Sequence, residues 1–278
     1  MSERIAVIGG GKIGEALLAG LIAAGHQPKN LAVAEPNEGR ARELSEEYGV
    51  LVTDIPTAVE GSQYVFIAVK PDIVDAVLRQ LARVDDDGES ERVTISLAAG
   101  VPIARYENAL PAGVPVVRVM PNTPMLVSEA MSAVSPGRHV DPEQLTAVVG
   151  LLESVGKVIV VPEKQMDAVT AISGSGPAYV FLLAESMIDA GVALGLTRAQ
   201  ASELAVQTIR GSGILMSDSG VSPVDLRAAV TSPGGTTAAA IRVLEENGAR
   251  AAMYRATEAC AQASARAGRR PDVEGLGG

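Results

Sequence analysis

RIAVIGGGKIG, residues 4–14, is the stretch that decides the fold. Its first half, residues 4–8, is apolar and rich in β-branched side chains, which is typical of a buried strand. Gly9, Gly11 and Gly14 then follow with the spacing G-x-G-x-x-G, and apolar residues at helical spacing come directly after them. The motif alone is a weak signal, but between a strand and a helix it indicates dinucleotide binding.

Each glycine of the motif has its own physical role. Gly9 permits a tight turn at the end of the strand, Gly11 lets the backbone approach a pyrophosphate, and Gly14 lets the helix and strand pack closely. The first amides of the helix have no acceptors within the helix, so they can bind phosphate oxygens. The alternative is an ordinary glycine-rich turn, which the strand–turn–helix context disfavours.

Short apolar runs alternate with helical patterns over the first half of the chain. Further strands are predicted at residues 31–34, 64–69, 93–97, 116–119, 131–134 and 157–161. This alternation predicts parallel pairing in a doubly wound sheet with helices on both faces. After Val161 the pattern is helical to about residue 268. The predicted fold class is therefore α/β, a Rossmann-type doubly wound sheet in residues 1–161 followed by an all-α part in residues 162–278.

One helix of the first half is clearly marked. Asp141 can cap it, Pro142 suits its first turn, and the apolar face continues to about residue 155. Two segments lack apolar periodicity altogether. We predict a solvated loop at residues 85–89 (DDDGE) and a loose tail at residues 269–278.

The helical half carries helix-start signals and one unusual helix. Thr197 and Gln200 predict a capping box, and Ser222 with Pro223 predicts another helix start. Residues 177–194 are apolar nearly all round, which predicts a helix that is buried on every side. Such a helix would complete its core against a partner chain. We therefore predict an all-α C-terminal dimerisation domain and a homodimer.

The composition argues against several classes of function. A net charge of −10, a pI of about 4.8 and an aromatic content of 3% argue against nucleic acid as a partner, because an acidic surface repels phosphates. Cys260 is the single cysteine, and His26 and His139 are the two histidines, so we predict neither a disulfide nor a metal site. No signal-peptide pattern and no membrane span are evident, and we expect a cytoplasmic enzyme.

Glu35 bears on which dinucleotide is bound. It follows the second predicted strand, roughly 20 residues after Gly14, where a carboxylate usually binds the ribose 2′-hydroxyl of NAD and repels the 2′-phosphate of NADP. Arg40 or Arg42 could offset that repulsion by folding back over the ribose. Alternatively, Glu35 points into solvent and selects nothing. The cofactor is therefore predicted as NADPH or NADH.

Two loops follow predicted strands at the edge where a Rossmann-type sheet binds its ligands. In residues 68–71 (AVKP), Lys70 could contact a cofactor phosphate or hydroxyl, or lie in solvent at a helix start. In residues 119–124 (VMPNTP), Asn122 could hydrogen-bond the nicotinamide end of the cofactor. A rigid turn set by two prolines explains the second loop equally well.

Two further segments combine hydroxyl groups with glycines in the helical half. Residues 173–177 (SGSGP), which include Ser175, lie between two predicted helices, and residues 231–237 (TSPGGTT) precede another. Hydroxyls and backbone amides at helix N-termini are suited to binding a carboxylate. Either segment alone is explained by a capped helix start. Two of them in one apolar domain favour a substrate site.

The order of five segments resembles one family. GGGKIGEALLAGL (9–21), AVKPD (68–72), VMPNTP (119–124), SGSGPAYVF (173–181) and TSPGGTTAAAI (231–241) look like those of pyrroline-5-carboxylate reductases, over roughly residues 3–265. The last two segments discriminate, because many dehydrogenases share the glycine motif. The resemblance implies a Rossmann domain and a helical domain that interlocks with a second subunit, with larger rings of dimers in similar proteins.

The resemblance also implies a reaction and the residues that serve it. Hydride transfer from NAD(P)H to C5 of 1-pyrroline-5-carboxylate would give L-proline, the last step of proline biosynthesis. The implied cofactor-binding residues are Gly9, Gly10, Gly11, Lys12, Ile13, Gly14, Ala68, Val69, Lys70 and Pro71, with Ala98 and Ala99 near the nicotinamide. Ser232, Gly234, Gly235 and Thr237 would cradle the substrate carboxylate and ring nitrogen, with Thr236 adjacent.

Thr237 is the candidate catalytic hydroxyl, placed to hydrogen-bond the ring nitrogen and orient C5. A cyclic imine becomes electrophilic once it is protonated, and solvent can supply that proton. No histidine or buried acid is therefore required, and positioning would supply most of the rate.

Three other functions compete with pyrroline-5-carboxylate reduction. A β-hydroxyacid dehydrogenase needs a base, usually a lysine in its second domain, and no lysine follows Lys164. A non-catalytic dinucleotide-binding protein has no need of two hydroxyl-rich segments. Reduction of a related cyclic imine with a six-membered ring stays open, because one methylene changes the fit by only ~1–3 kcal/mol.

Overall fold

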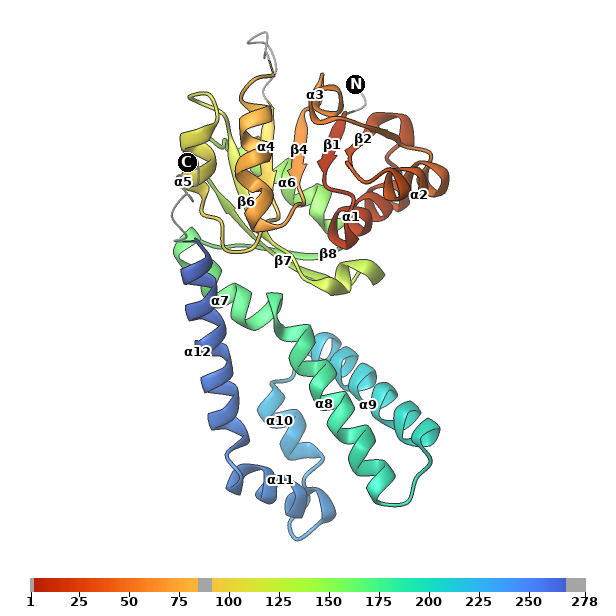
Figure 1. Ribbon diagram of the computed structural model, residues 1–278. Coiled ribbons are helices and arrows are strands. Elements are labelled where there is room, and N and C mark those ends of the chain that lie inside the picture. The colour runs from red at the N-terminus through yellow and green to blue at the C-terminus, as the bar shows by residue number, and fades with distance from the viewer. Residues whose placement is uncertain (1–2, 85–91, 269–278) are drawn as a thin grey trace, which may run out of the picture. The chain divides into compact units, whose positions relative to one another are not determined.

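The computed structural model describes residues 3–84 and 92–268, so the predicted loop at 85–89 and tail at 269–278 lie outside the described residues. Contacts divide the chain into two units (Figure 1). The first comprises the chain up to Ser175 together with the chain from Cys260 onward, and the second comprises Gly176–Ala259. The boundary predicted at residues 161/162 concerns functional domains and stays a prediction.

The first unit is built on an eight-stranded sheet with the order β3-β2-β1-β4-β5-β6-β7-β8. The strands are β1 (Ile5–Ile8), β2 (Leu31–Ala34), β3 (Leu51–Thr53), β4 (Tyr64–Ile67), β5 (Val93–Ser96), β6 (Val116–Met120), β7 (Ala130–Pro136) and β8 (Gly156–Val160). The order reverses at β1, which pairs in parallel with β2 on one side and with β4 on the other. This is the switch point at which doubly wound sheets bind ligands.

The sheet differs from the prediction in two places. The expectation of parallel pairing throughout is wrong at β7, which runs antiparallel to β6. Only residues 121–129 join these two strands, and they hold a 3₁₀ turn at Thr123–Val127, too short a connection for a parallel crossover. Strand β3 was not predicted, because it has three residues, LVT, and its first is exposed.

Helices cover both faces of the sheet, as predicted (Figure 1). On one face lie α1 (Lys12–Ala23), α2 (Glu38–Tyr48) and α6 (Pro142–Glu153); on the other lie α3 (Ile55–Val59), α4 (Val74–Leu81) and α5 (Ile103–Ala109). Strand β1 shows how the two cores are separated. Ile5 and Val7 are buried with α1, whereas Ala6 and Ile8 are buried with α4. The alternation follows from the two-residue period of a strand.

The predicted helix starts are confirmed. Asp141 accepts a hydrogen bond from the Gln144 amide in a complete capping box, with Pro142 in the first turn. Thr197 and Gln200 form a second capping box at α9. Short helices complete the described chain: 3₁₀ turns at Pro28–Asn30, Pro71–Ile73 and Glu163–Gln165, α7 at Met166–Val169, and a π-helical turn at Thr170–Gly174.

The second unit is entirely helical. It contains α8 (Gly176–Ala193), α9 (Arg198–Asp218), α10 (Pro223–Ala229), α11 (Thr236–Glu246) and the start of α12 (Ala249–Gly268). Ser222 caps α10 by accepting from the Asp225 amide, as predicted. Within the described residues, no helix is long and apolar enough to cross a membrane.

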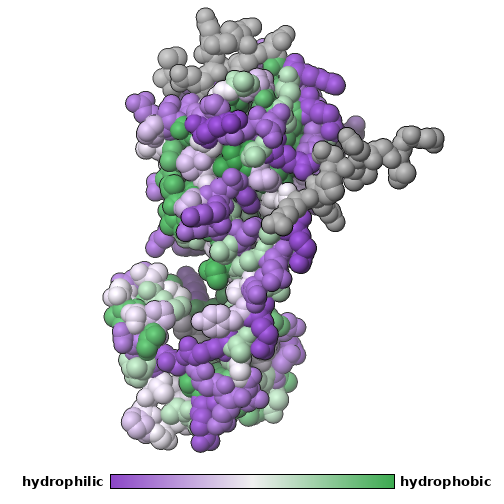
Figure 2. Space-filling view, turned by 90° about the vertical axis from the view of Figure 1, so that its left-hand side faces the viewer, coloured by the Kyte–Doolittle hydropathy of each residue, from purple (hydrophilic) through white to green (hydrophobic). Residues whose placement is uncertain are grey.

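The second unit has little core of its own. The prediction that residues 177–194 are buried on every side is wrong for the single chain, because no residue of α8 is buried. Phe181 is 65% exposed and Leu182 is 63% exposed, and hydrophobic side chains lie at the surface of this unit (Figure 2). The physical reason is a lack of neighbours, since α8 packs mainly against α9.

Gly156→Ala tests the packing of the sheet edge. Gly156 has φ +151°, and an added Cβ would lie 2.2 Å from the Ala130 carbonyl oxygen on β7. We expect this change to lower the free energy of unfolding by ~2 kcal/mol or more, measured by urea unfolding. In the matched control Gly150→Ala, the new Cβ meets nothing within 4 Å on an exposed helix face. That change should stabilise by ~0.5–1 kcal/mol, and equal effects of the two would contradict the account.

Candidate active site

Two positions of the turn between β1 and α1, Gly9 and Gly14, require glycine. Gly9 has φ +103°, and a Cβ added there would lie 2.8 Å from the Ala68 carbonyl oxygen. A Cβ on Gly14 would lie 2.0 Å from the Gly9 carbonyl oxygen. Gly11 caps α1 in an extended conformation, with no side-chain cap. The first amides of α1 are therefore available to an anion, with the positive end of the helix dipole behind them.

A pocket of about 740 Å³ opens beside this turn. The carboxyl ends of β1, β2, β3 and β4 supply most of its wall. Of the predicted cofactor-binding residues, the pocket is lined by Gly9, Gly11, Glu35, Ala68, Val69 and Lys70. Its size suits part of a dinucleotide, and the glycine turn supplies a surface that a phosphate can approach closely. The residues present therefore fit a dinucleotide.

The far wall of this pocket was not predicted from the sequence. Thr53, Asp54 and Ile55 line it after β3, and Gln80 lines it from α4. Asp54 caps α3 by accepting from the Thr57 amide, and the Thr57 hydrogen bonds hold the pKa of this carboxyl below its usual range. The signal was present, because Asp-x-Pro is a typical helix start.

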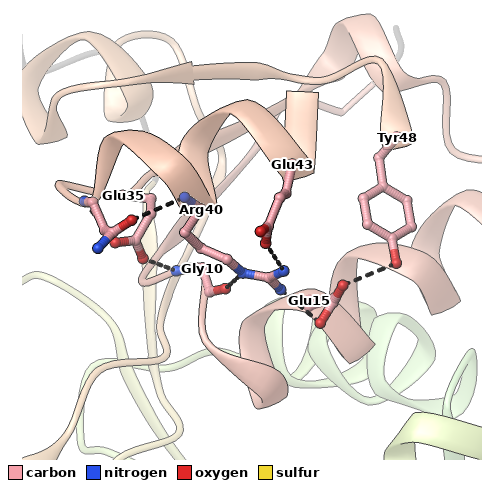
Figure 3. A network of polar contacts seen from close by, with 7 residues as sticks. Gly10, Glu15, Glu35, Arg40, Glu43 and Tyr48 are labelled. Carbon is pink, nitrogen blue, oxygen red and sulfur yellow. Dashed lines mark hydrogen bonds and ion pairs between the residues drawn. The ribbon is translucent and has the colours of Figure 1, made fainter. Parts of the chain in front are cut away.

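Glu35 and Arg40 form a polar network around the glycine turn (Figure 3). One oxygen of the Glu35 carboxylate accepts from the Gly10 amide and the other from the Asn37 amide, each at 2.9 Å. Arg40 Nε donates to the Gly10 carbonyl at 2.8 Å. The rest of its guanidinium pairs with Glu15 at 2.6 Å and with Glu43 at 3.0 Å. Glu35 thus faces the turn, so it does not simply point into solvent.

The phenol of Tyr48 also belongs to this network. Tyr48 donates to Glu15 at 3.3 Å. Burial raises the pKa of Tyr48 to about 12, and the carboxylate of Glu15 adds to the effect. For Arg40, desolvation lowers the pKa, but hydrogen bonds to Glu43 and Glu15 more than offset it. Both donors therefore stay protonated at neutral pH.

Lys70 and Pro71 leave β4 beside the pocket. Lys70 is exposed, and Pro71 begins the 3₁₀ turn Pro71–Ile73. Among the described lining residues, Lys70 is the one cation. This position favours a contact with a cofactor phosphate or hydroxyl over a purely solvated lysine, and the contact itself remains a prediction.

The loop after β5 is held from beneath by a buried hydroxyl pair. Ser96 and Tyr106 share a hydrogen bond, and the Ala98 amide donates to the Ser96 hydroxyl at 3.3 Å. Burial raises the pKa of Tyr106 to about 12, so it remains a neutral phenol. Ala98 is buried and Ala99 is exposed. The backbone proposed to lie near the nicotinamide is therefore fixed in place.

Asn122 has a structural task. Its side chain donates to the Ser173 carbonyl at 3.1 Å and accepts from the Met131 amide at 2.9 Å. Pro177 lacks an N–H, so it leaves the Ser173 carbonyl without its helical partner, and Asn122 satisfies it. A contact between Asn122 and the nicotinamide remains a prediction.

The segment at residues 173–177 differs from the predicted loop. It continues a π-helical turn, Thr170–Gly174, directly into α8. The hydroxyl of Ser175 lies 3.2 Å from the Cys260 sulfur. The Ser175 amide donates to the Thr170 carbonyl, five residues back, at 2.8 Å, which is the bond of a π-helical turn. Ser175 is therefore at a helix irregularity rather than in an open loop.

The segment at residues 231–237 is a loop that ends in a helix start, as predicted. Gly234 has φ +71°, and the Gly235 amide donates to the Ser232 carbonyl at 3.0 Å. Gly235 is the N-cap residue of α11, and no side chain of the described residues accepts a hydrogen bond from the first amides there. Thr236 is the first helical residue. The first amides of α11 and the half-buried Thr237 therefore form a second place where an anion can be bound.

The described residues contain no group of three or more side chains suited to hold a metal ion.

Two family models match the chain. A model described as "NADP oxidoreductase coenzyme F420-dependent" matches residues 4–100, and one described as "Pyrroline-5-carboxylate reductase dimerisation" matches residues 163–267. A pyrroline-5-carboxylate reductase of Corynebacterium melassecola is 52% identical, covering 95% of this chain and 98% of that protein. One from Methanosarcina acetivorans is 41% identical, covering 97% and 99%.

Solved structures agree with these relatives. A pyrroline-5-carboxylate reductase of Coxiella burnetii has a TM-score of 0.90 at 33% identity, covering 97% of this chain and 100% of that one. A Plasmodium falciparum pyrroline carboxylate reductase, solved with NADP bound, has a TM-score of 0.85 at 32% identity, covering 96% and 98%. The expected fold class, a Rossmann-type sheet followed by a helical dimerisation domain, is confirmed.

Gly11→Ala tests the glycine turn as the phosphate site. A Cβ on Gly11 meets no protein atom within 4 Å, and its φ of −69° suits alanine, so the fold should be unaffected. The methyl group would instead occupy space needed by a bound pyrophosphate. We expect the Kd of NADH and NADPH, measured by titration calorimetry, to rise ~10-fold or more, as overpacking by one methyl group predicts. An unchanged Kd in a stably folded variant would show that the turn does not bind the pyrophosphate.

Proposed function

This chain belongs to the pyrroline-5-carboxylate reductase family, and we propose how its own residues carry out the reaction. The chain is an NAD(P)H-dependent oxidoreductase, which confirms the expected activity, reduction of 1-pyrroline-5-carboxylate to L-proline. The roles of individual residues, described next, are proposals that rest on the geometry of the two units.

The first unit holds the dinucleotide. The turn from Gly9 to Gly14, with the amides of Lys12 and Ile13, binds the pyrophosphate, and Lys70 adds a positive charge at the pocket wall. When bound, the reduced nicotinamide supplies a hydride. Ala98 and Ala99 bound the nicotinamide side, where the Ser96–Tyr106 pair holds the backbone still.

The second unit holds the substrate. The amides at the start of α11 and the hydroxyl of Ser232 bind the carboxylate, because no side chain competes for that helix end. Thr237 hydrogen-bonds the ring nitrogen and orients C5. The imine arrives protonated from solvent, so the chain needs no acid of its own, and the second unit contains no histidine.

A single observation carries this proposal: α11 begins without a side-chain cap, next to the half-buried Thr237. The direct test mixes the purified protein with 1-pyrroline-5-carboxylate and either reduced nicotinamide cofactor. We expect substrate-dependent loss of nicotinamide absorbance, with L-proline as product. Binding of both cofactors without turnover would favour a non-catalytic dinucleotide-binding protein, and turnover with only a six-membered analogue would favour the related cyclic imine.

We also propose that the chain functions in the cytoplasm as a homodimer. The exposed face of α8 supports this assembly, with large apolar side chains that a second copy would cover. On this account residues 1–161 are the dinucleotide-binding domain and residues 162–278 are the substrate-binding and dimerisation domain. The resemblance further implies that dimers assemble into a larger ring. Light scattering at micromolar concentration should give a dimer or a multiple of it, and a stable monomer would contradict this proposal.

Thr237→Ala tests the orienting hydroxyl. The loss of one hydrogen bond of ~1.4 kcal/mol should lower kcat/KM for pyrroline-5-carboxylate by ~10-fold or more. The matched control is Thr257→Ala on α12, where the hydroxyl bonds only to carbonyls of its own helix. That change should leave kcat/KM and the cofactor Kd unaltered. Equal kinetics in the two variants would show that Thr237 does not orient the substrate.

A further inference from the structure

The residue after β2 decides which ribose the pocket accepts. Glu35 directly follows β2 and lines the pocket beside the glycine turn. In doubly wound sheets the adenosine ribose of a bound dinucleotide lies at this position, and a carboxylate there accepts from the ribose 2′-hydroxyl. A 2′-phosphate at this position would need a cation to pair with it.

The carboxylate of Glu35 is held in place by the backbone. Its two oxygens accept from the amides of Gly10 and Asn37, both at 2.9 Å. These two bonds leave further lone pairs on the carboxylate, so it can still accept from a ribose hydroxyl. It cannot donate to a phosphate, and moving it away would leave the partly buried Gly10 amide without its partner.

The nearest cation is committed elsewhere. All three nitrogens of the Arg40 guanidinium bind protein acceptors: the Gly10 carbonyl, Glu15 and Glu43 (Figure 3). Turning Arg40 over the ribose would break these contacts and leave Glu15 without its guanidinium partner. Arg42, the other arginine considered for this task, is exposed and does not line the pocket.

The rest of the pocket wall adds negative charge. Asp54 also lines it directly after β3, so two acidic residues line this space and Lys70 is the one cation among the described lining residues. Lys70 follows β4, beside the strand that leads into the glycine turn, where we propose that it pairs with the pyrophosphate of the same ligand. A second phosphate on the ribose would meet Glu35 and Asp54 without a cation of its own.

We infer that Glu35 is the specificity-determining residue for the cofactor and that this chain prefers NADH over NADPH. The inference rests on the proposed function of the pocket and deepens it. NADP is bound in the Plasmodium falciparum structure, so that relative accommodates the 2′-phosphate that this chain would disfavour. Repulsion of the 2′-phosphate by a fixed carboxylate should make the Kd of NADPH at least ~10-fold higher than that of NADH.

The test measures binding, without substrate, to the full-length wild-type protein and to Glu35→Gln. Titration calorimetry with NADH and NADPH, and with AMP and adenosine 2′,5′-bisphosphate, gives the ratio of affinities with and without the 2′-phosphate. We expect the wild type to disfavour the 2′-phosphate in both pairs. In Glu35→Gln, both ratios should shift by ~10-fold in favour of the ligand with the 2′-phosphate, which is the factor assigned to the charge. Raising the salt concentration should bring the wild-type ratios closer to one, because salt screens the repulsion.

Two matched variants separate charge at Glu35 from other causes. Glu38→Gln removes the same charge from an exposed position that does not line the pocket, and it should leave both ratios unchanged. Lys70→Ala should weaken both members of each pair by a similar factor. The inference is overturned if the wild type binds NADPH as tightly as NADH or if Glu35→Gln leaves the ratios unaltered. It is also overturned if Lys70→Ala selectively weakens binding of the two ligands that carry a 2′-phosphate. Failure to bind either nucleotide would instead refute the proposed function of the pocket.

Discussion

The close approach of the β1–α1 turn to its surroundings is the constraint on which the rest of the site depends. A Cβ on Gly14 would overlap the Gly9 carbonyl oxygen, and Gly9 itself has a positive φ beside the Ala68 carbonyl. The turn can therefore be tight enough to bring the first amides of α1 to the carboxyl edge of the sheet. The helix dipole and these amides then make the edge attractive to phosphate through backbone groups alone.

This arrangement organises the neighbouring strands. Because β2 and β4 flank β1 in parallel, Glu35 and residues 68–70 end at the same edge as the glycines. Glu35 ties the edge together by accepting from the Gly10 amide, while Arg40 holds the Gly10 carbonyl. A network that stabilises the turn thus also determines the charge that a ribose would meet. On our proposal, the contacts that stabilise the turn also determine the choice of cofactor.

The sequence predicted features whose causes are local. Strands β1 and β2, the glycine turn, and the caps at Asp141 and Thr197 depend on residues close together in the chain, and the structure contains them. Features set by distant contacts were missed. The short strand β3 is defined by its pairing with β2, and the π-helical turn before Pro177 is completed by Asn122 from another segment.

The helical unit shows a different limit. The all-round apolar pattern of residues 177–194 predicted burial, yet one chain leaves α8 without buried residues. Periodicity reports that a surface avoids water but not which molecule covers it. The direction of the Arg40 side chain could not be predicted from the sequence either, because its pairing with Glu15 forms only when α1 and α2 pack together.

Hydrogen exchange with and without reduced cofactor tests the central claim most directly, namely that the β1–α1 turn binds the dinucleotide phosphates. With cofactor bound to saturation, the account predicts slower exchange of backbone amides in residues 9–15, at the start of α1, and in residues 68–73, after β4. Unchanged exchange in residues 9–15, with protection confined to other segments, would show that the cofactor binds elsewhere and would contradict the account.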